Sequence, residues 1–141
     1  MFLPALRPEI SQGDIFEGVR VLEILGGREE SYTGPVVLLS HDCEFDKPFE
    51  YVLVARVLPL NTAPRSSWND IQQGNALNAI YVPAVAPRPE SFINLRYIHR
   101  LPKDELREAN VVGRRATSMT DDGRAAMLAY LYRFFARALP G

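Results

Sequence analysis

Short apolar runs alternate with turn-forming residues along most of the chain, and eleven prolines punctuate them. The runs 35–40 (PVVLLS) and 51–60 (YVLVARVLPL) are largely apolar, which predicts buried strands, and 79–84 (AIYVPA) predicts a further strand. The first two are close in sequence, so we expect them to pair as a hairpin. Residues 91–101 alternate enough to predict a further strand. One face of that strand would carry Ile93, Leu95, Tyr97 and His99.

The remaining segments predict a bent strand, a loop and two helices. β-Forming residues over 13–25 favour a strand pair or one bent strand, with a glycine that permits the kink. Residues 26–34 are polar and bounded by glycines, which predicts a loop. A short helix is expected within 63–75. Thr120 is the expected N-cap of a helix over 119–138. Its apolar stripe would consist of Met127, Leu128, Leu131, Phe134, Phe135 and Ala138.

This order of elements predicts a mainly β fold with helices. Several short strands come first, one small helix lies among them, and a helix ends the chain, without the strand–helix alternation of a parallel sheet. We therefore expect a small antiparallel barrel or a strongly bent sheet with helices packed on it. A chain of 141 residues is long enough to bury a core, and we expect it to form one domain, 1–141.

Composition and cysteine usage narrow the class of protein. The sequence is 47% hydrophobic and 23% charged, which is typical of a soluble globular protein. The lone cysteine, Cys43, excludes an internal disulfide and favours a reducing, cytoplasmic location. The N-terminal segment lacks the charged region of a signal peptide, and no apolar run approaches the roughly 18 residues of a membrane span.

Charge is divided unevenly along the chain. Residues 1–50 contain ten acidic and four basic residues, a net charge of −6, whereas residues 51–141 contain seven acidic and twelve basic residues, a net charge of +5. Fourteen of the 16 basic residues are arginine, whose forked side chain suits phosphate and carboxylate groups. Two solvated surfaces of opposite sign are the plainer interpretation, and a nucleic-acid-binding face is the alternative.

A dense group of polar residues follows the first apolar run, in the stretch 40–46 (SHDCEFD). Polar residues directly after a central strand lie where binding loops gather at the open end of a sheet. A structural role is the alternative, because Asp42 would turn the chain by bonding backbone amides.

RNA cleavage is the first chemistry that these residues suggest. Attack by a ribose 2′-hydroxyl on its own phosphate needs a base, an acid and a cationic stabiliser. His41 would be the base, since an imidazole titrates near neutral pH, and His99 would be the acid if the strands bring it close. A histidine among apolar neighbours is, however, more often a core residue. The arginines that would hold the phosphate are Arg28, Arg56, Arg96 and Arg100.

Metal and thiol chemistry at Cys43 are weaker alternatives. Zinc sites draw ligands from two separated segments, and only His99 is a distant nitrogen ligand. Loops for hard cations need regularly spaced oxygens and a glycine, which this stretch lacks. We therefore expect neither a metal nor another cofactor. His41 and Cys43 would lie about 7 Å apart on a strand, too far for a direct hydrogen bond. A metal or small-ligand site centred on Cys43 stays a third hypothesis.

Two segments resemble the PemK/MazF family of toxins: QGDIFEGVRVLEI…GREESYTGPVVLLSHD and FINLRYIHRLPKDEL. The first is similar to the family's opening GDI strand, its glycine-rich loop and its RPVLVLS strand. The second is similar to the family's late strand and the short helix after it. The resemblance implies a Src-homology-3-like barrel over 12–106 with the C-terminal helix packed on it. It also implies a homodimeric, metal-independent endoribonuclease that cleaves single-stranded RNA and is held by a small antitoxin.

The sequence departs from the family at the position of the catalytic arginine, so the family's catalytic residues do not all have a counterpart here. The family's catalytic arginine precedes the proline of RPVLVLS, and Gly34 stands there in this chain. Arg28 is the nearest basic candidate, and Ser40 matches the family's Ser/Thr at the end of the strand. Our first hypothesis is therefore an RNA-acting protein that uses Ser40, His41 and Arg28, with Arg96 contacting phosphate. The second is a non-catalytic barrel module, of phage, plasmid or stress-system origin, that grips a protein partner.

Overall fold

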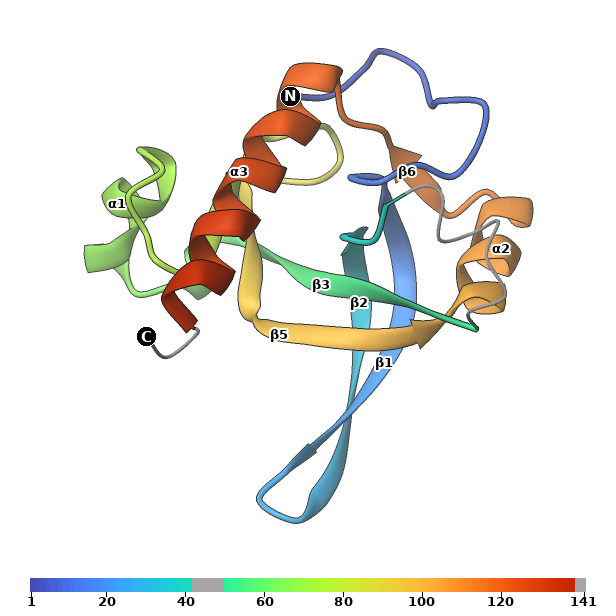
Figure 1. The fold of residues 1–141 in the computed structure, drawn as a ribbon, viewed down its shortest axis with the longest axis horizontal. Helices are drawn as coiled ribbons and strands as arrows, with labels where there is room; N and C mark the ends of the chain where they lie inside the picture. The colour runs from blue at the N-terminus through green and yellow to red at the C-terminus, as the bar shows by residue number, and fades with distance from the viewer. Residues whose placement is uncertain (42–49, 139–141) are drawn as a thin grey trace.

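The computed structural model spans the chain, and the structure describes residues 1–41 and 50–138. The elements follow one another as shown in Figure 1: β1 (Ile15–Leu25), β2 (Arg28–Leu38), β3 (Tyr51–Pro59), α1 (Trp68–Gln72), β4 (Ala79–Val82), β5 (Ser91–Pro102), α2 (Lys103–Val111), β6 (Arg115–Thr117) and α3 (Asp121–Ala138). Two short 3₁₀ turns, Leu60–Thr62 and Arg65–Ser67, precede α1. Within these ranges, no helix is long and apolar enough to cross a membrane.

The six strands form one antiparallel sheet in the order β4-β5-β3-β2-β1-β6. The expected pairing of the runs 35–40 and 51–60 is confirmed by three residue pairs between β2 and β3. The edge strands β4 and β6 do not pair with each other in the described part of the chain, so the sheet is strongly bent but not closed. The fold is thus a mixed α/β structure with an open antiparallel sheet, and of the two expected forms, a small barrel or a strongly bent sheet, the barrel is not observed.

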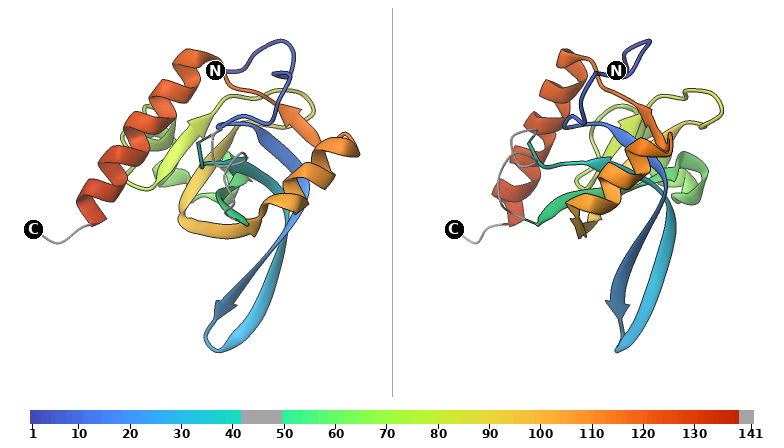
Figure 2. Two further views of the ribbon diagram at one scale, coloured as in Figure 1. Left: turned by 45° about the vertical axis from the view of Figure 1, so that its right-hand side comes forward. Right: turned by 90° about the vertical axis from the view of Figure 1, so that its right-hand side faces the viewer.

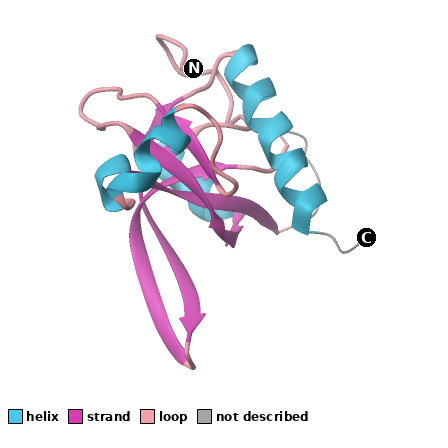
Figure 3. Cartoon of the chain, turned by 90° about the vertical axis from the view of Figure 1, so that its left-hand side faces the viewer, coloured by secondary structure: helices cyan, strands magenta, loops and turns pink. Residues whose placement is uncertain are grey.

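A long hairpin of β1 and β2 projects from the body of the molecule (Figures 1 and 3). Its turn is Gly26–Gly27, where φ angles of 57° and 79° match the left-handed turn that closes a two-residue hairpin. The expectation of a loop over 26–34 is therefore wrong, because residues 28–34 belong to β2. Their polar character reflects a strand that extends away from the core, where only Tyr32 and Gly34 are partly buried.

The sheet is packed between helices on its two faces (Figure 2). Neighbouring residues of β1 point to opposite sides: Ile15 belongs to the cluster beneath α3, and Phe16 to the cluster beneath α2. A third, smaller cluster around Leu60 and Ile71 anchors α1 beside β4 and β5. Each apolar run thus serves two packed faces, as its lack of alternation predicted.

The α3 helix begins as predicted, but only part of its predicted apolar stripe is buried. The Gly123 N–H donates to Thr120 Oγ1 at 3.0 Å, which is the expected N-cap bond. Met127 and Leu131 are buried against the sheet. Leu128 and Phe135, which were expected to share the buried stripe, are exposed on another face of the helix.

A bulge in β5 moves the second half of this strand to the other side of the sheet. Ala55 lies opposite Ile98, yet the next residue, Arg56, lies opposite Asn94, so β5 has three extra residues, 95–97. An odd number of extra residues reverses the alternation of side chains. The expected shared face is therefore corrected: Ile93 and Leu95 pack under α3, whereas His99 lies opposite Val54, on the α2 side.

Candidate functional site

A compact polar cluster lies where the hairpin joins the body of the sheet. Its centre is Arg56 of β3, whose Nη2 lies 2.7 Å from Glu23 Oε2 of β1. The guanidinium carbon lies 4.6 Å from the ring centroid of Tyr32 and 4.7 Å from that of Tyr97. Four strands contribute to this Arg56 cluster, which also includes His99 of β5. The Arg56 and Glu23 side chains are only 13% and 14% exposed.

His99 is held in its neutral form within the Arg56 cluster. Arg56 Nε donates to His99 Nε2 at 3.1 Å, so the imidazole accepts through Nε2 and its proton resides on Nδ1. Burial lowers the pKa of His99, and the nearby Arg56 charge lowers it further, against a smaller opposing effect of Glu23. Because the Nε2 lone pair already accepts from Arg56, His99 positions the arginine and is not arranged to donate a proton as an acid.

Tyr32 is fixed across Gly34, the position where the family resemblance leads one to expect arginine. The Tyr32 hydroxyl lies 3.1 Å from the Pro35 carbonyl and 3.3 Å from the Val57 carbonyl, to which it donates. Burial raises the pKa of Tyr32 to about 12, so the hydroxyl stays a donor at neutral pH. A Cβ atom on Gly34 would lie 2.6 Å from this hydroxyl oxygen. Glycine at 34 therefore permits the tyrosine to cover one face of Arg56.

The residues expected to catalyse RNA cleavage are not brought together. Ser40 Oγ accepts from the Leu53 N–H at 2.8 Å, which ties the end of the first apolar run to β3. His41 follows it and is exposed. Arg28 begins β2 beside the hairpin turn, and an 11-residue strand is about 35 Å long. Residues 42–49, with Cys43 among them, lie outside the described residues.

A groove lies beside the Arg56 cluster on the same face of the sheet. It has a volume of about 580 Å³ and runs between α1, the loop before β4, and β5. Asn94, which lines it, is the cross-strand partner of Arg56, and paired residues project from one face. Leu58, Ile71 and Phe92 supply apolar lining. The polar lining includes Asn75, Asn78, Asn94, Asp70 and Arg96.

Arg96 and Arg100 are both exposed on β5 but have different surroundings. Arg96 lines the groove, and with the Asn78 amide oxygen turned toward it, its Nε and Nη2 both donate to that oxygen. Arg100 lies over the ring of the exposed Tyr51, with its guanidinium carbon 4.5 Å from the centroid. Of the arginines expected to contact phosphate, Arg96 alone lines this groove.

Sequence reasoning missed Glu23, Tyr32 and Tyr97 as members of the Arg56 cluster. Only the hairpin register brings the first two within reach of Arg56, and only the β5 bulge brings the third. Among the described residues, no group of three or more His, Cys, Asp or Glu side chains is arranged to hold a metal ion. A scan against protein-family models finds no match, and a search of curated proteins finds no similar sequence.

Proposed function

We propose that this protein is a divergent PemK/MazF-like protein that binds single-stranded RNA in the groove beside α1 without cleaving it. The composition of the groove carries the proposal: apolar side chains lie beside three asparagine amides, with the Arg96 guanidinium among them. Unpaired RNA bases present apolar faces and polar edges, and proteins recognise them through apolar contacts, hydrogen bonds and arginine.

The size and charges of the groove suit a short piece of one strand. A volume of about 580 Å³ lies within the range of small-ligand sites, so one or two nucleotides would fill it. Asparagine amides both donate and accept, which matches the edges of nucleobases. Asp70 would repel a phosphate, so the sugar–phosphate backbone would pass on the Arg96 side of the groove.

Binding is favoured over cleavage because, among the residues that the structure describes, no acid–base pair faces the groove. Arg28 is about a strand length from Ser40, and Ser40 Oγ is already bonded to the backbone of β3. His99 is buried, and its Nε2 accepts from Arg56. Arg56 itself is neutralised by Glu23 and covered by two tyrosine rings.

The test is binding and cleavage of short single-stranded RNA in excess chelator, measured by fluorescence anisotropy and by gel. We expect saturable binding that weakens with salt, with no cleavage products, and a loss of about three- to tenfold in affinity for Arg96→Gln. Arg20→Gln, an exposed arginine on the hairpin, is the matched control and should bind as the wild type does. Absence of binding by the wild type would refute the proposal, and cleavage would replace it with the ribonuclease hypothesis.

A second candidate function is binding of a protein partner through the hairpin. Leu22 and Ile24 share one face of β1 and are 53% and 77% exposed, while Glu23 between them turns to Arg56. Exposed apolar side chains on a projecting element favour a protein contact, either with a second copy or with an antitoxin-like chain. Sedimentation of the wild type beside a Leu22→Ser/Ile24→Ser variant tests the homodimer, which would become a monomer.

A further inference from the structure

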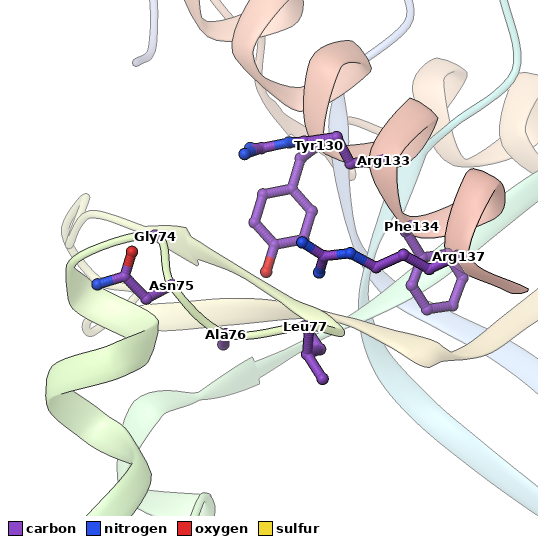
Figure 4. A pocket seen from close by; sticks show the side chains of 8 residues that line it. All are labelled: Gly74, Asn75, Ala76, Leu77, Tyr130, Arg133, Phe134 and Arg137. Atoms are coloured by element: carbon purple, nitrogen blue, oxygen red, sulfur yellow. The ribbon is translucent and has the colours of Figure 1, made fainter.

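A small pocket near the C-terminal end of α3 is lined by two arginines, a tyrosine and an asparagine, together with glycine and apolar residues. Its volume is about 130 Å³, and it lies between α3 and the loop 74–77 that leads toward β4 (Figure 4). The helix contributes Tyr130, Arg133, Phe134 and Arg137. None of the described residues that line the pocket is acidic, so two guanidinium charges face it without a lining carboxylate.

Tyr130 supplies a buried hydroxyl whose hydrogen has no acceptor among the described residues. The residue is 9% exposed, and its hydroxyl oxygen is buried near the Ala79 backbone, without an acceptor for its hydrogen among the described residues. Figure 4 shows this hydroxyl pointing away from α3 toward the loop 74–77, beside the Arg137 side chain. A buried hydroxyl without a partner costs free energy, and a ligand oxygen at this point would remove that cost.

The two arginines remain available to a ligand. The Arg133 guanidinium carbon lies 5.3 Å from the ring centroid of Tyr130, and Arg137 follows one helical turn later, on the same face. Neither forms an ion pair with another described residue, in contrast to Arg56. The end of the helix carries only about half of a negative charge, which two full positive charges outweigh.

We propose that this pocket binds the terminal phosphate of a single-stranded RNA, an inference that rests on the proposed RNA-binding function. A terminal phosphate carries up to two negative charges and matches two arginines, each able to bond its oxygens in a forked geometry. The Tyr130 hydroxyl donates to a third oxygen. Because burial raises the pKa of Tyr130, the hydroxyl keeps its proton at neutral pH.

Size and position favour a terminal phosphate over an internal one. A cavity of about 130 Å³ has room for several waters, enough for a phosphate group but too little for a whole nucleotide. The pocket and the groove share Asn75, Ala76 and Leu77 as a common wall. A strand whose end enters the pocket would therefore place its next nucleotides in the groove.

The experiment compares RNA oligonucleotides of one sequence with a 5′-phosphate, with a 3′-phosphate or with two hydroxyl ends. They compete with a labelled oligonucleotide for the full-length protein, at constant ionic strength. We expect one phosphorylated form to bind about tenfold tighter than the form without phosphate. Arg137→Gln and Tyr130→Phe should each remove most of this preference, whereas the hydroxyl-ended form should bind nearly as before.

Matched controls come from the exposed surface. Tyr132→Phe changes an exposed tyrosine of the same helix, and Arg20→Gln changes an exposed arginine of the hairpin. Both should keep the full preference for the phosphorylated end. Circular dichroism of each variant shows whether it is folded, and Tyr130→Phe removes only one oxygen, so it keeps the test informative if an arginine variant unfolds.

A second arm with inorganic phosphate separates this inference from the proposed function. RNA that binds equally with and without a terminal phosphate would overturn the phosphate pocket while leaving RNA binding intact. A second outcome is that inorganic phosphate stabilises the wild type against heat but not Arg137→Gln, while RNA does not bind. That result would support a phosphate-binding pocket and rule out RNA as its ligand. Absence of both effects would overturn both proposals.

Discussion

Two groups of arginine and tyrosine in this molecule have opposite surroundings. In the Arg56 cluster, the guanidinium lies between two tyrosine rings, 2.7 Å from a carboxylate and 3.1 Å from an imidazole nitrogen. In the pocket of α3, Arg133 also lies beside a tyrosine ring, yet neither it nor Arg137 has a carboxylate partner in the described part of the chain.

The difference indicates which arginines serve the fold and which can serve a ligand. A buried guanidinium needs a counter-charge, and Glu23 supplies one within the protein, so Arg56 has little left to offer a phosphate. Within the described residues, the α3 pocket lacks that counter-charge, and the hydrogen of the Tyr130 hydroxyl has no acceptor. Sequence alone treats all of these arginines alike, whereas the surroundings separate them.

The largest expected effect is the loss of stability on Arg56→Ala. The change removes the ion pair and both ring contacts and leaves Glu23 largely buried without its counter-charge, at a cost of about 3 kcal/mol in the free energy of unfolding. Arg137→Ala, at the open pocket, should change it by less than about 0.5 kcal/mol. Urea titrations of both variants measure this contrast, and equal midpoints for the two would contradict it.

The next effect concerns Gly34, whose missing side chain leaves space for Tyr32. Gly34→Ala should destabilise the protein by about 1–2 kcal/mol, because its Cβ would displace a hydroxyl that donates to two carbonyls. A double-mutant cycle tests the cause. On a Tyr32→Ala background the cost of Gly34→Ala should largely vanish, and an unchanged cost would place the strain in the backbone instead.

The sequence predicted the buried parts of the fold better than the parts that shape the sites. Apolar runs placed β3, β4 and the body of β2, because burial on both faces leaves a pattern that a single chain displays. Residues 28–34 were missed because the β2 half of the hairpin is polar and mostly exposed, so no apolar pattern marks it as a strand. The three-residue β6 was missed too, since its pairing with β1 is a long-range contact that local composition does not signal.

The candidate sites depend on register, which composition does not contain. His99 was expected beside Leu95, and three extra residues in β5 place it beside Arg56 instead. Arg133 and Arg137 are four residues apart on α3 and so share a helix face, but they were not among the predicted site residues. This face of α3 lies against the loop 74–77, and such a long-range contact cannot be predicted from the sequence pattern of the helix.

A matched pair of single-oxygen deletions should show smaller effects, with a clear cost only for Tyr32→Phe. Tyr32→Phe removes a hydroxyl that donates to two carbonyls and should cost about 1 kcal/mol. Tyr130→Phe removes a buried hydroxyl whose hydrogen has no acceptor among the described residues, and it should change the stability by no more than a few tenths of a kcal/mol. Differential scanning calorimetry in phosphate-free buffer makes the comparison. An equal loss of stability in both variants would mean that the Tyr130 hydroxyl has a partner in solution.

The smallest expected effect is on the pH dependence of the free energy of unfolding, to which we expect His99 to contribute. The folded protein holds the pKa of His99 below its ordinary value of 6.5, so the unfolded chain binds more protons as the pH falls below 6.5. Stability should therefore rise with pH through this region, up to about 6.5, and His99→Gln should flatten that rise while keeping an acceptor for Arg56 Nε. His41→Gln, at an exposed histidine, is the matched control and should leave the rise intact. Urea midpoints from pH 5 to 7.5 measure it. If the urea midpoints of the wild type and of His99→Gln changed with pH in parallel, the neutral imidazole would not contribute to the stability of the Arg56 cluster.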